Sequence, residues 1–287
     1  MSNIRIVTDS TADLSPEMVE RYGIQVVPLT VFVEGKAYKD KIDITNDAFY
    51  DILRTVKELP TTSQPSPAVF AEVYRKLAAE GAEHIISIHI STELSGTYQS
   101  SVLAAGIVAE EVQVHNVNSR IATMGLGLLV LSAARLVEDG KSLEEVLAAL
   151  DYMVQNQSLY FLLDSLDNLH KGGRIGKASH LFGSLLNIKP VLCFNDGVIG
   201  VYEKVRGNKD NKALERLIEI LAEKIDPSRK LYCALGYCDN RETAEYIVER
   251  LKDRVDCDEF LFMQIGSVVG THIGMGAVGM AFYQYES

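Results

Sequence analysis

Tryptophan is absent from this chain of 287 residues, and cysteine is scarce, with only four residues. These four, Cys193, Cys233, Cys238 and Cys257, form no C-x-x-C pair and no histidine-flanked zinc spacing. The scarcity and the spacing exclude a disulfide-stapled scaffold and a zinc motif, so we expect reduced thiols. The first residues also lack the basic and apolar regions of a signal peptide, and we therefore predict a cytoplasmic location.

Acidic residues outnumber basic residues in this chain. The chain has 28 Lys and Arg against 39 Asp and Glu, which gives a formal net charge of -11 at pH 7. A nucleic-acid partner is excluded, because such a protein needs a basic surface to displace counterions from phosphates. Long apolar runs are missing too. The most apolar stretch, residues 124–134, is too short to cross a bilayer and predicts the centre of a buried helix, so no stable membrane insertion is expected.

Apolar residues, at 47% of the chain, are plentiful enough for a large core, and the length favours two domains. Strand-like and helix-like segments alternate through the first half. Residues 85–90 form a nearly continuous apolar run after a helix predicted over residues 66–80, which is typical of a parallel strand covered on both faces. We predict an N-terminal α/β domain with a parallel sheet over residues 1–158.

The pattern changes near Ser158. Residues 191–194 and 198–205 flank Asn195-Asp196-Gly197, which indicates a hairpin and therefore antiparallel pairing. We predict a C-terminal α+β domain with a mixed or antiparallel sheet over residues 159–287, packed on the first domain in an α/β fold. No flexible linker separates the halves, so a shared interface is expected, and such interfaces often hold ligands.

Two polar segments stand at places suited to an anion. Residues 61–67, Thr-Thr-Ser-Gln-Pro-Ser-Pro, precede a predicted helix whose first N–H groups lack partners, although capping alone also explains them. Ser95 and Gly96 follow the strand ending at Ile90, where open parallel sheets bind ligands. Gly96 would let a ligand approach the backbone, and the competing interpretation is a loop with a helix cap.

Two glycine-rich segments are less specific. Residues 171–176 lack the spacing of a phosphate loop or a dinucleotide motif, and they predict a turn that ends a helix, with Arg174 facing a cleft or solvent. Five glycines between residues 266 and 279 surround Thr271 and His272, which predicts tight bends near a ligand or a glycine-punctuated connection between strands. A single histidine is more often structural than functional.

A hydrolase is the alternative function. Ser95 and His272 would act as nucleophile and base towards an ester or thioester, with Asp9 or Asp239 orienting the histidine. The sequence has no G-x-S-x-G elbow, and serine, histidine and aspartate occur in most chains of this size. A sensor of phosphate-bearing ligands is a third hypothesis, and it predicts a small polar pocket.

The whole chain resembles the DegV family, whose members bind fatty acids. The resemblance rests on the joint occurrence, in order, of short motifs at residues 7–14, 62–67, 94–100, 171–175, 188–190, 204–207 and 272–274. It implies a carrier without catalytic residues, with no cofactor and no metal, whose ligand is a long-chain fatty acid.

The resemblance also implies roles for individual residues. The carboxylate contacts of the family fall on Thr62 and Ser95, with Ser63, Gly96, Thr271 and His272 as supporting neighbours. Met275 stands where the family often has proline, which implies a more mobile loop around His272.

A partner is implied as well. Some family members present the bound acid to a separate ATP-dependent fatty acid kinase, which forms an acyl phosphate for phospholipid synthesis. Arg174 and Arg206 match the basic positions expected to contact the kinase and the transferred phosphoryl group.

Overall fold

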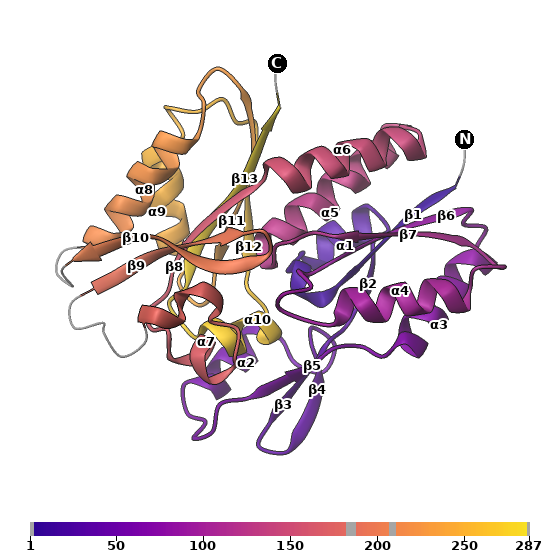
Figure 1. The fold of residues 1–287 in the computed structure, drawn as a ribbon, viewed down its shortest axis with the longest axis horizontal. Coiled ribbons are helices and arrows are strands. Elements are labelled where there is room, and N and C mark those ends of the chain that lie inside the picture. Colours follow the sequence, from indigo (N-terminus) through magenta and orange to yellow (C-terminus); the bar gives the residue numbers. More distant parts are fainter. Residues whose placement is uncertain (1–2, 182–187, 207–210, 286–287) are drawn as a thin grey trace.

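The computed structural model describes residues 3–181, 188–206 and 211–285 and arranges them in layers (Figure 1). Two large sheets lie on either side of a central pair of helices, and other helices cover the outer face of each sheet. A small third sheet lies below them in the view of Figure 1. The first large sheet is parallel and the second is mixed, so the predicted α/β fold class is confirmed.

The N-terminal sheet is parallel throughout, in the strand order β2-β1-β6-β7. Side chains alternate between its faces: Ile6 of β1 points into the central core, and the next residue, Val7, packs with Phe70 on the outer face. The 3-10 helix η1 (Ser10–Ala12) and α1 (Pro16–Arg21) follow β1. The other elements of this layer are β1 (Ile4–Asp9), β2 (Gln25–Val27), β6 (His84–His89), β7 (Gln113–Asn118), α3 (Pro67–Ala79) and α4 (Thr97–Ile107).

The C-terminal sheet has the strand order β10-β9-β8-β13-β11-β12, and among its described residues only β11 and β12 pair in parallel. The predicted hairpin turns at Asp196 and Gly197, which both have positive φ angles, of 50° and 84°, as a two-residue hairpin requires. Two helices cover its outer face. The elements are β8 (Ser158–Leu162), β9 (Ile188–Asn195), β10 (Val198–Arg206), β11 (Lys230–Tyr237), β12 (Phe260–Gln264), β13 (Val278–Tyr285), α8 (Lys212–Lys224) and α9 (Arg241–Leu251).

Helix α5 (Thr123–Glu138) is the centre of the molecule, because it contacts β1 and β6 on one side and β11 and β13 on the other. Its side chains are buried over nearly its whole length, as predicted from the apolar run. Its neighbour α6 (Leu143–Asn156) begins with a capping box formed by Ser142 and Glu145. No helix within the described residues is both long enough and apolar enough to span a membrane.

The three-stranded sheet differs most from our expectation. Its strands are β3 (Thr30–Val33), β4 (Lys36–Lys39) and β5 (Thr61–Ser63), with α2 (Asn46–Leu53) inserted before β5. Residues 24–33 have the composition of one extended segment, but the chain changes sheets at Pro28, between β2 and β3. Thr61–Ser63, which we placed in a polar segment before a helix, form a strand that pairs with β3.

The glycine-rich segment near the C-terminus connects β12 to β13, which was one of our two expectations. It also contains a helix that we did not expect, α10 (Ser267–Ile273), which is followed by bends at Gly274 and Gly276 with φ angles of 76° and 70°. Position 270 in this helix requires glycine, because a Cβ there would lie 2.8 Å from the hydroxyl oxygen of Tyr50 in α2. The nearby α7 (Asp167–Lys171) and η2 (Gly176–Leu181) complete this region.

The predicted boundary near residue 158 coincides with the change of sheet, since α6 ends at Asn156 and β8 begins at Ser158. One apolar core contains side chains from both sides of this point, including Ile88 and Phe161. The division into domains of residues 1–158 and 159–287 stays a prediction.

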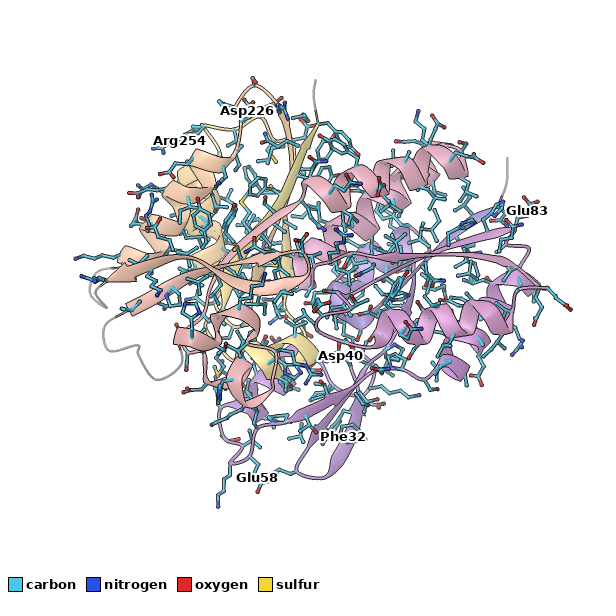
Figure 2. All side chains as sticks on the ribbon, viewed as in Figure 1. Phe32, Asp40, Glu58, Glu83, Asp226 and Arg254 are labelled. Carbon is cyan, nitrogen blue, oxygen red and sulfur yellow. The ribbon has the colours of Figure 1, made fainter. Side chains whose placement is uncertain are left out.

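The start of α10 is tied to the N-terminal part of the chain by buried polar contacts. The Asp13 carboxylate accepts a hydrogen bond from the Gly266 N–H at 2.9 Å and pairs with Lys41 at 3.2 Å. Asp40, near the middle of Figure 2, accepts from the Ser267 hydroxyl at 2.6 Å. Because these carboxylates satisfy groups at the helix N-terminus, they fix α10 against the N-terminal elements.

We expect Asp13 to make stability depend on pH. Burial raises the pKa of its carboxyl from 3.8 to about 6, although Lys41 opposes the shift. The folded chain therefore holds this proton more tightly than the unfolded chain, and the stability it contributes is full below pH 4 and lost as pH rises through 6. Compared with Asp13→Asn, the wild type should lose about 3 kcal/mol of unfolding free energy between pH 4 and 7.

Urea unfolding of both proteins at several pH values measures this difference. His272 titrates in both proteins, so its contribution cancels. A difference that stays constant from pH 4 to 7 would show that Asp13 does not titrate in this range.

Gly127 in α5 offers a second test of the packing. A Cβ at this position would lie 2.3 Å from the carbonyl oxygen of Ala12 and 2.8 Å from the Met263 sulfur. Gly127→Ala should therefore lower the free energy of unfolding by about 1–3 kcal/mol, although alanine is the better helix former. Gly106→Ala in α4 is the matched control, because nothing lies within 4 Å of its Cβ position, and it should raise stability by up to about 1 kcal/mol. Urea unfolding measures both, and a stabilised Gly127→Ala would contradict the packing.

Candidate functional site

A cavity of about 330 Å³ lies where the carboxyl end of the parallel sheet meets the C-terminal sheet and α10. This volume is in the range of small-molecule sites. Side chains such as Met124, Phe161 and Val268 are almost fully buried and line its interior. The apolar lining consists of Leu29, Ile90, Leu94, Ala122, Met124, Leu159, Phe161, Leu169, Phe194, Ile199, Ile265, Val268, Val269, Ile273, Ala277 and Val278.

The rest of the lining consists of the buried Thr123 and six further polar side chains. These six are half-buried or exposed, which places them towards the mouth, and we call this set the polar ring. It consists of Thr62, Ser63, Gln64, Ser95, Arg174 and His272.

Thr62 and His272 are joined across 210 residues of sequence by a hydrogen bond of 2.8 Å between Thr62 Oγ1 and His272 Nε2. Burial, with a smaller effect from Arg174, lowers the pKa of His272 to about 4, so the imidazole is neutral at pH 7. Its Nδ1 is buried and has no hydrogen-bond partner among the described residues. Since a buried N–H without an acceptor is rare, we assign the proton to Nε2. Thr62 then accepts from His272, and its own hydroxyl proton is free to be donated.

Gly172 and Arg174 place the 171–176 turn against this pair. A Cβ at residue 172 would lie 2.4 Å from His272 Nδ1, so only glycine leaves room for the imidazole in this position. The Arg174 guanidinium donates to the carbonyl oxygens of Gly172 at 2.7 Å and of Leu94 at 3.2 Å. Arg174 thus connects the histidine side of the polar ring to the loop that carries Ser95.

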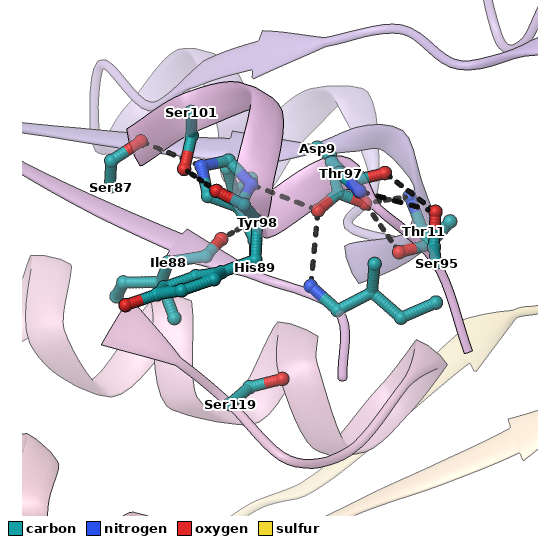
Figure 3. A network of polar contacts seen from close by, with 12 residues as sticks. Asp9, Thr11, Ser87, Ile88, His89, Ser95, Thr97, Tyr98, Ser101 and Ser119 are labelled. Atoms are coloured by element: carbon teal, nitrogen blue, oxygen red, sulfur yellow. Dashed lines mark hydrogen bonds and ion pairs between the residues drawn. The ribbon is translucent and has the colours of Figure 1, made fainter. Parts of the chain in front are cut away.

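Ser95 lies just before α4. Its Oγ is 2.9 Å from Thr97 Oγ1 and accepts weakly from the Thr97 N–H at 3.4 Å (Figure 3). Ser95 therefore contacts the first residue of the helix, although the N-cap is Gly96 and this residue forms no side-chain cap hydrogen bond. Because Ser95 also lines the cavity, its hydroxyl is placed to reach a ligand as well.

The structure brings five of the eight predicted site residues to one cavity: Thr62, Ser63, Ser95, Arg174 and His272. The other three lie elsewhere.

Gly96 is the N-cap of α4 and lies against Gln64, outside the lining. Thr271 is fully buried and donates to the Ser267 carbonyl oxygen at 2.8 Å, so its hydroxyl serves the helix. Arg206 lies at the exposed end of β10 in a separate, shallow hollow. The binding and contact roles of all eight residues stay predictions.

Sequence reasoning missed two polar residues of the lining. Gln64 belongs to the 61–67 segment that we had singled out, so the signal was present, and its amide donates to Ser100 at 3.1 Å. Thr123, at the start of α5, carried no signal, because it precedes an apolar run. It has a positive φ of 49°, which a β-branched residue seldom adopts and which marks a strained backbone at the cavity wall.

The arrangement that a hydrolase needs is not formed. Asp9 pairs with His89 at 2.9 Å, within a fully buried network that continues from His89 to Ser87 at 2.7 Å (Figure 3). Asp239 pairs with Arg54 at 3.4 Å and accepts from the Gly276 N–H. Neither carboxylate orients His272, whose Nε2 is engaged by Thr62. Within the described residues, no group of three or more His, Cys, Asp or Glu side chains is placed to hold a metal ion.

The similarity to known proteins, in sequence and in structure, extends over the whole chain. A DegV domain-containing protein of Halalkalibacterium halodurans is 37% identical over 283 residues, which are 99% of each chain. Among solved structures, a fatty-acid-binding DegV family protein from Thermus thermophilus has a TM-score of 0.91 at 37% identity, covering 99% of this chain and 100% of its own.

Two further solved structures have a similar fold. DegV of Bacillus subtilis, a fatty-acid-binding protein, has a TM-score of 0.89 at 34% identity, covering 99% of this chain and 100% of its own. A stearic-acid-binding protein from Eubacterium ventriosum has a TM-score of 0.88 at 29% identity, covering 99% and 98%. The model of the DegV family matches residues 3–285, and with these relatives it shows that the chain is a member of the DegV family.

Proposed function

We propose that this protein binds a long-chain fatty acid in the cavity, with the alkyl tail among the apolar residues and the carboxylate held by Thr62 and Ser95. One observation carries the proposal: two hydroxyls from distant elements line the same deep apolar cavity, at its polar ring. The fatty-acid binding of relatives with nearly the same fold supports it.

The tail supplies most of the binding free energy in this proposal. Each methylene removed from water contributes about 0.8 kcal/mol, so several methylenes in a close-fitting cavity suffice for tight binding. The aliphatic and aromatic lining offers no polar competitor along most of its surface.

The head group requires donors, because an unpaired carboxylate is costly to remove from water. Thr62 has a hydroxyl proton to donate, since His272 supplies the hydrogen bond that Thr62 accepts. Ser95 provides a second hydroxyl, and the exposed Arg174 guanidinium adds positive charge at the mouth. Hydrogen bonds to a charged group are about twice as strong as neutral ones, which favours this site for a carboxylate.

The proposal extends to a role as carrier in the cytoplasm. A carboxylate held at the polar ring stays reachable from solvent, so a separate ATP-dependent kinase would be able to phosphorylate it to an acyl phosphate for phospholipid synthesis. Arg174 lies where it would stabilise charge on the transferred group. Arg206, on the exposed end of β10, is better suited to docking the kinase than to contacting the fatty acid.

Lipid extraction tests the binding proposal directly. Protein purified from bacteria is denatured, extracted and analysed by mass spectrometry, and native mass spectrometry is run before and after incubation with palmitic and oleic acid. We expect one fatty acid for each chain. A chain that stays bare in both measurements would refute the proposal.

The same samples separate the alternatives. A hydrolase would turn over acyl esters and form a serine adduct with a phosphonate inhibitor, and a phosphate sensor would be stabilised by sugar phosphates but not by fatty acids. Thermal shift compares the ligand classes, because only a ligand of the folded state raises the melting temperature. The apolar lining does not fit the small polar pocket that a phosphate sensor predicts. In the part of the chain that the structure describes, no carboxylate orients His272 as the hydrolase would need.

A further inference from the structure

Two of the four free cysteines lie in contact on the C-terminal sheet, away from the cavity. Cys233 is on β11, and Cys257 is in the loop between α9 and β12. Their sulfur atoms are 3.6 Å apart. Cys233 is buried, whereas Cys257 is half-buried and therefore reachable from solvent.

The loop that carries Cys257 is held against β11 on both sides of the cysteine. The Leu231 N–H donates to the Asp256 carbonyl oxygen at 2.8 Å. The Lys230 ammonium pairs with Asp256 at 3.7 Å and with Asp258 at 2.5 Å. Because one ammonium bridges the residues before and after Cys257, the loop keeps the two sulfur atoms in register.

From this geometry we propose that Cys257 and Cys233 form an oxidation site, at which a hydroperoxide converts the two thiols into a reversible disulfide. A disulfide needs a sulfur–sulfur distance of about 2.05 Å, which the side-chain torsions and the loop can supply from the present contact. Cys193, Cys233 and Cys238 are all almost fully buried, so Cys257 is the thiol that a peroxide can reach, and Cys233 is the thiol in contact with it.

The oxidation of the two thiols by hydrogen peroxide proceeds in two steps. The Cys257 thiolate attacks the peroxide, a sulfur–oxygen bond forms, the oxygen–oxygen bond breaks, and the released hydroxide takes a proton to become water. The Cys233 sulfur then attacks Cys257 Sγ, the sulfur–sulfur bond forms, and hydroxide leaves with the Cys233 proton as a second water. Two thiols and one hydrogen peroxide thus give one disulfide and two waters.

The surroundings favour Cys257 as the attacking thiol. The pKa of Cys257 is lowered by the hydrogen bond with Cys233 and by the nearby Lys230 charge, while the hydrogen bond and burial raise the pKa of Cys233. Thiolate character and access together select the cysteine that reacts first.

Thiol counting tests the proposal. The full chain is treated with hydrogen peroxide at pH 7, and free thiols are then blocked with N-ethylmaleimide under denaturing conditions for intact mass measurement. The reduced protein, with its four cysteines, should take four adducts, and the oxidised protein two. Peptide mapping should find residues 233 and 257 linked, and dithiothreitol should restore all four thiols. Closing this loop should also raise the melting temperature by several degrees.

Variants make the result decisive. Cys257→Ser changes a half-buried loop residue and should abolish the disulfide, whereas the double variant Cys193→Ser, Cys238→Ser should form it at the wild-type rate. Four adducts after peroxide treatment, or a bridge to another cysteine, would overturn the proposal. Cys233 faces the outer core with α8 and α9, so lipid extraction should give the same result for both redox states.

Discussion

Ala277→Phe is expected to abolish the binding of long-chain fatty acids. Ala277 lines the cavity and is 4% exposed, so the added ring has to occupy space proposed for the alkyl tail. Each methylene kept out of the cavity costs about 0.8 kcal/mol, or about fourfold in affinity. Exclusion of four methylenes would therefore weaken binding by more than about 100-fold.

A graded series makes this prediction sharper. Ala277→Val, Ala277→Leu and Ala277→Phe should progressively shorten the longest fatty acid that binds, while octanoic acid is affected least. Isothermal titration with acids of increasing length measures the trend, and thermal unfolding of each variant without lipid controls for damage to the fold. Wild-type affinity of Ala277→Phe for palmitic acid would mean that the tail does not lie in this cavity.

Thr62→Val and Ser95→Ala should each weaken fatty-acid binding by about 10- to 100-fold. Each change removes a hydrogen bond to a charged group, which contributes about 1.5–3 kcal/mol. Thr62→Val also leaves the His272 Nε2–H without its acceptor, so this variant should in addition lower the free energy of unfolding. The losses in the double variant should not be additive, because both hydroxyls bind one carboxylate.

The chain offers a matched control for this prediction. Thr271→Val makes the same chemical change beside His272, but the Thr271 hydroxyl donates to Ser267 and lies outside the cavity lining. It should lower thermal stability and leave affinity within about twofold of wild type. A fatty acid methyl ester should bind all variants equally weakly. Equal affinity losses in Thr62→Val and Thr271→Val would indicate general damage to α10 instead of a head-group contact.

Much of the fold could be predicted because its signals are local. Helix starts at Pro16, Pro67 and Leu143 follow from caps within a few residues, and the apolar run before Ser91 identifies a covered parallel strand. The hairpin at Asp196 follows from the two residues of its turn. The strand β5 was missed because its three residues acquire their conformation only by pairing with β3.

Some residues of the candidate site also have a local signal in the sequence, and others have none. The hydroxyl-rich segments that contain Thr62 and Ser95 were recognisable from composition and from their places before helices. Their association with His272 was implied by a family resemblance and not by any pattern in the residues. Thr123 could not be found at all, because its strained backbone arises from packing at the start of α5.

The sequence by itself determined most helices and strands of the two large sheets, the change from parallel to antiparallel pairing near Ser158, and the two polar segments, since caps, turns and periodicity act over a few residues. Only the tertiary structure decided that Thr62 and His272 meet across 210 residues, that Gly172 makes room for the imidazole, and that Thr271 turns away from the cavity. These outcomes depend on how α10 packs between distant elements, and no local pattern encodes that packing.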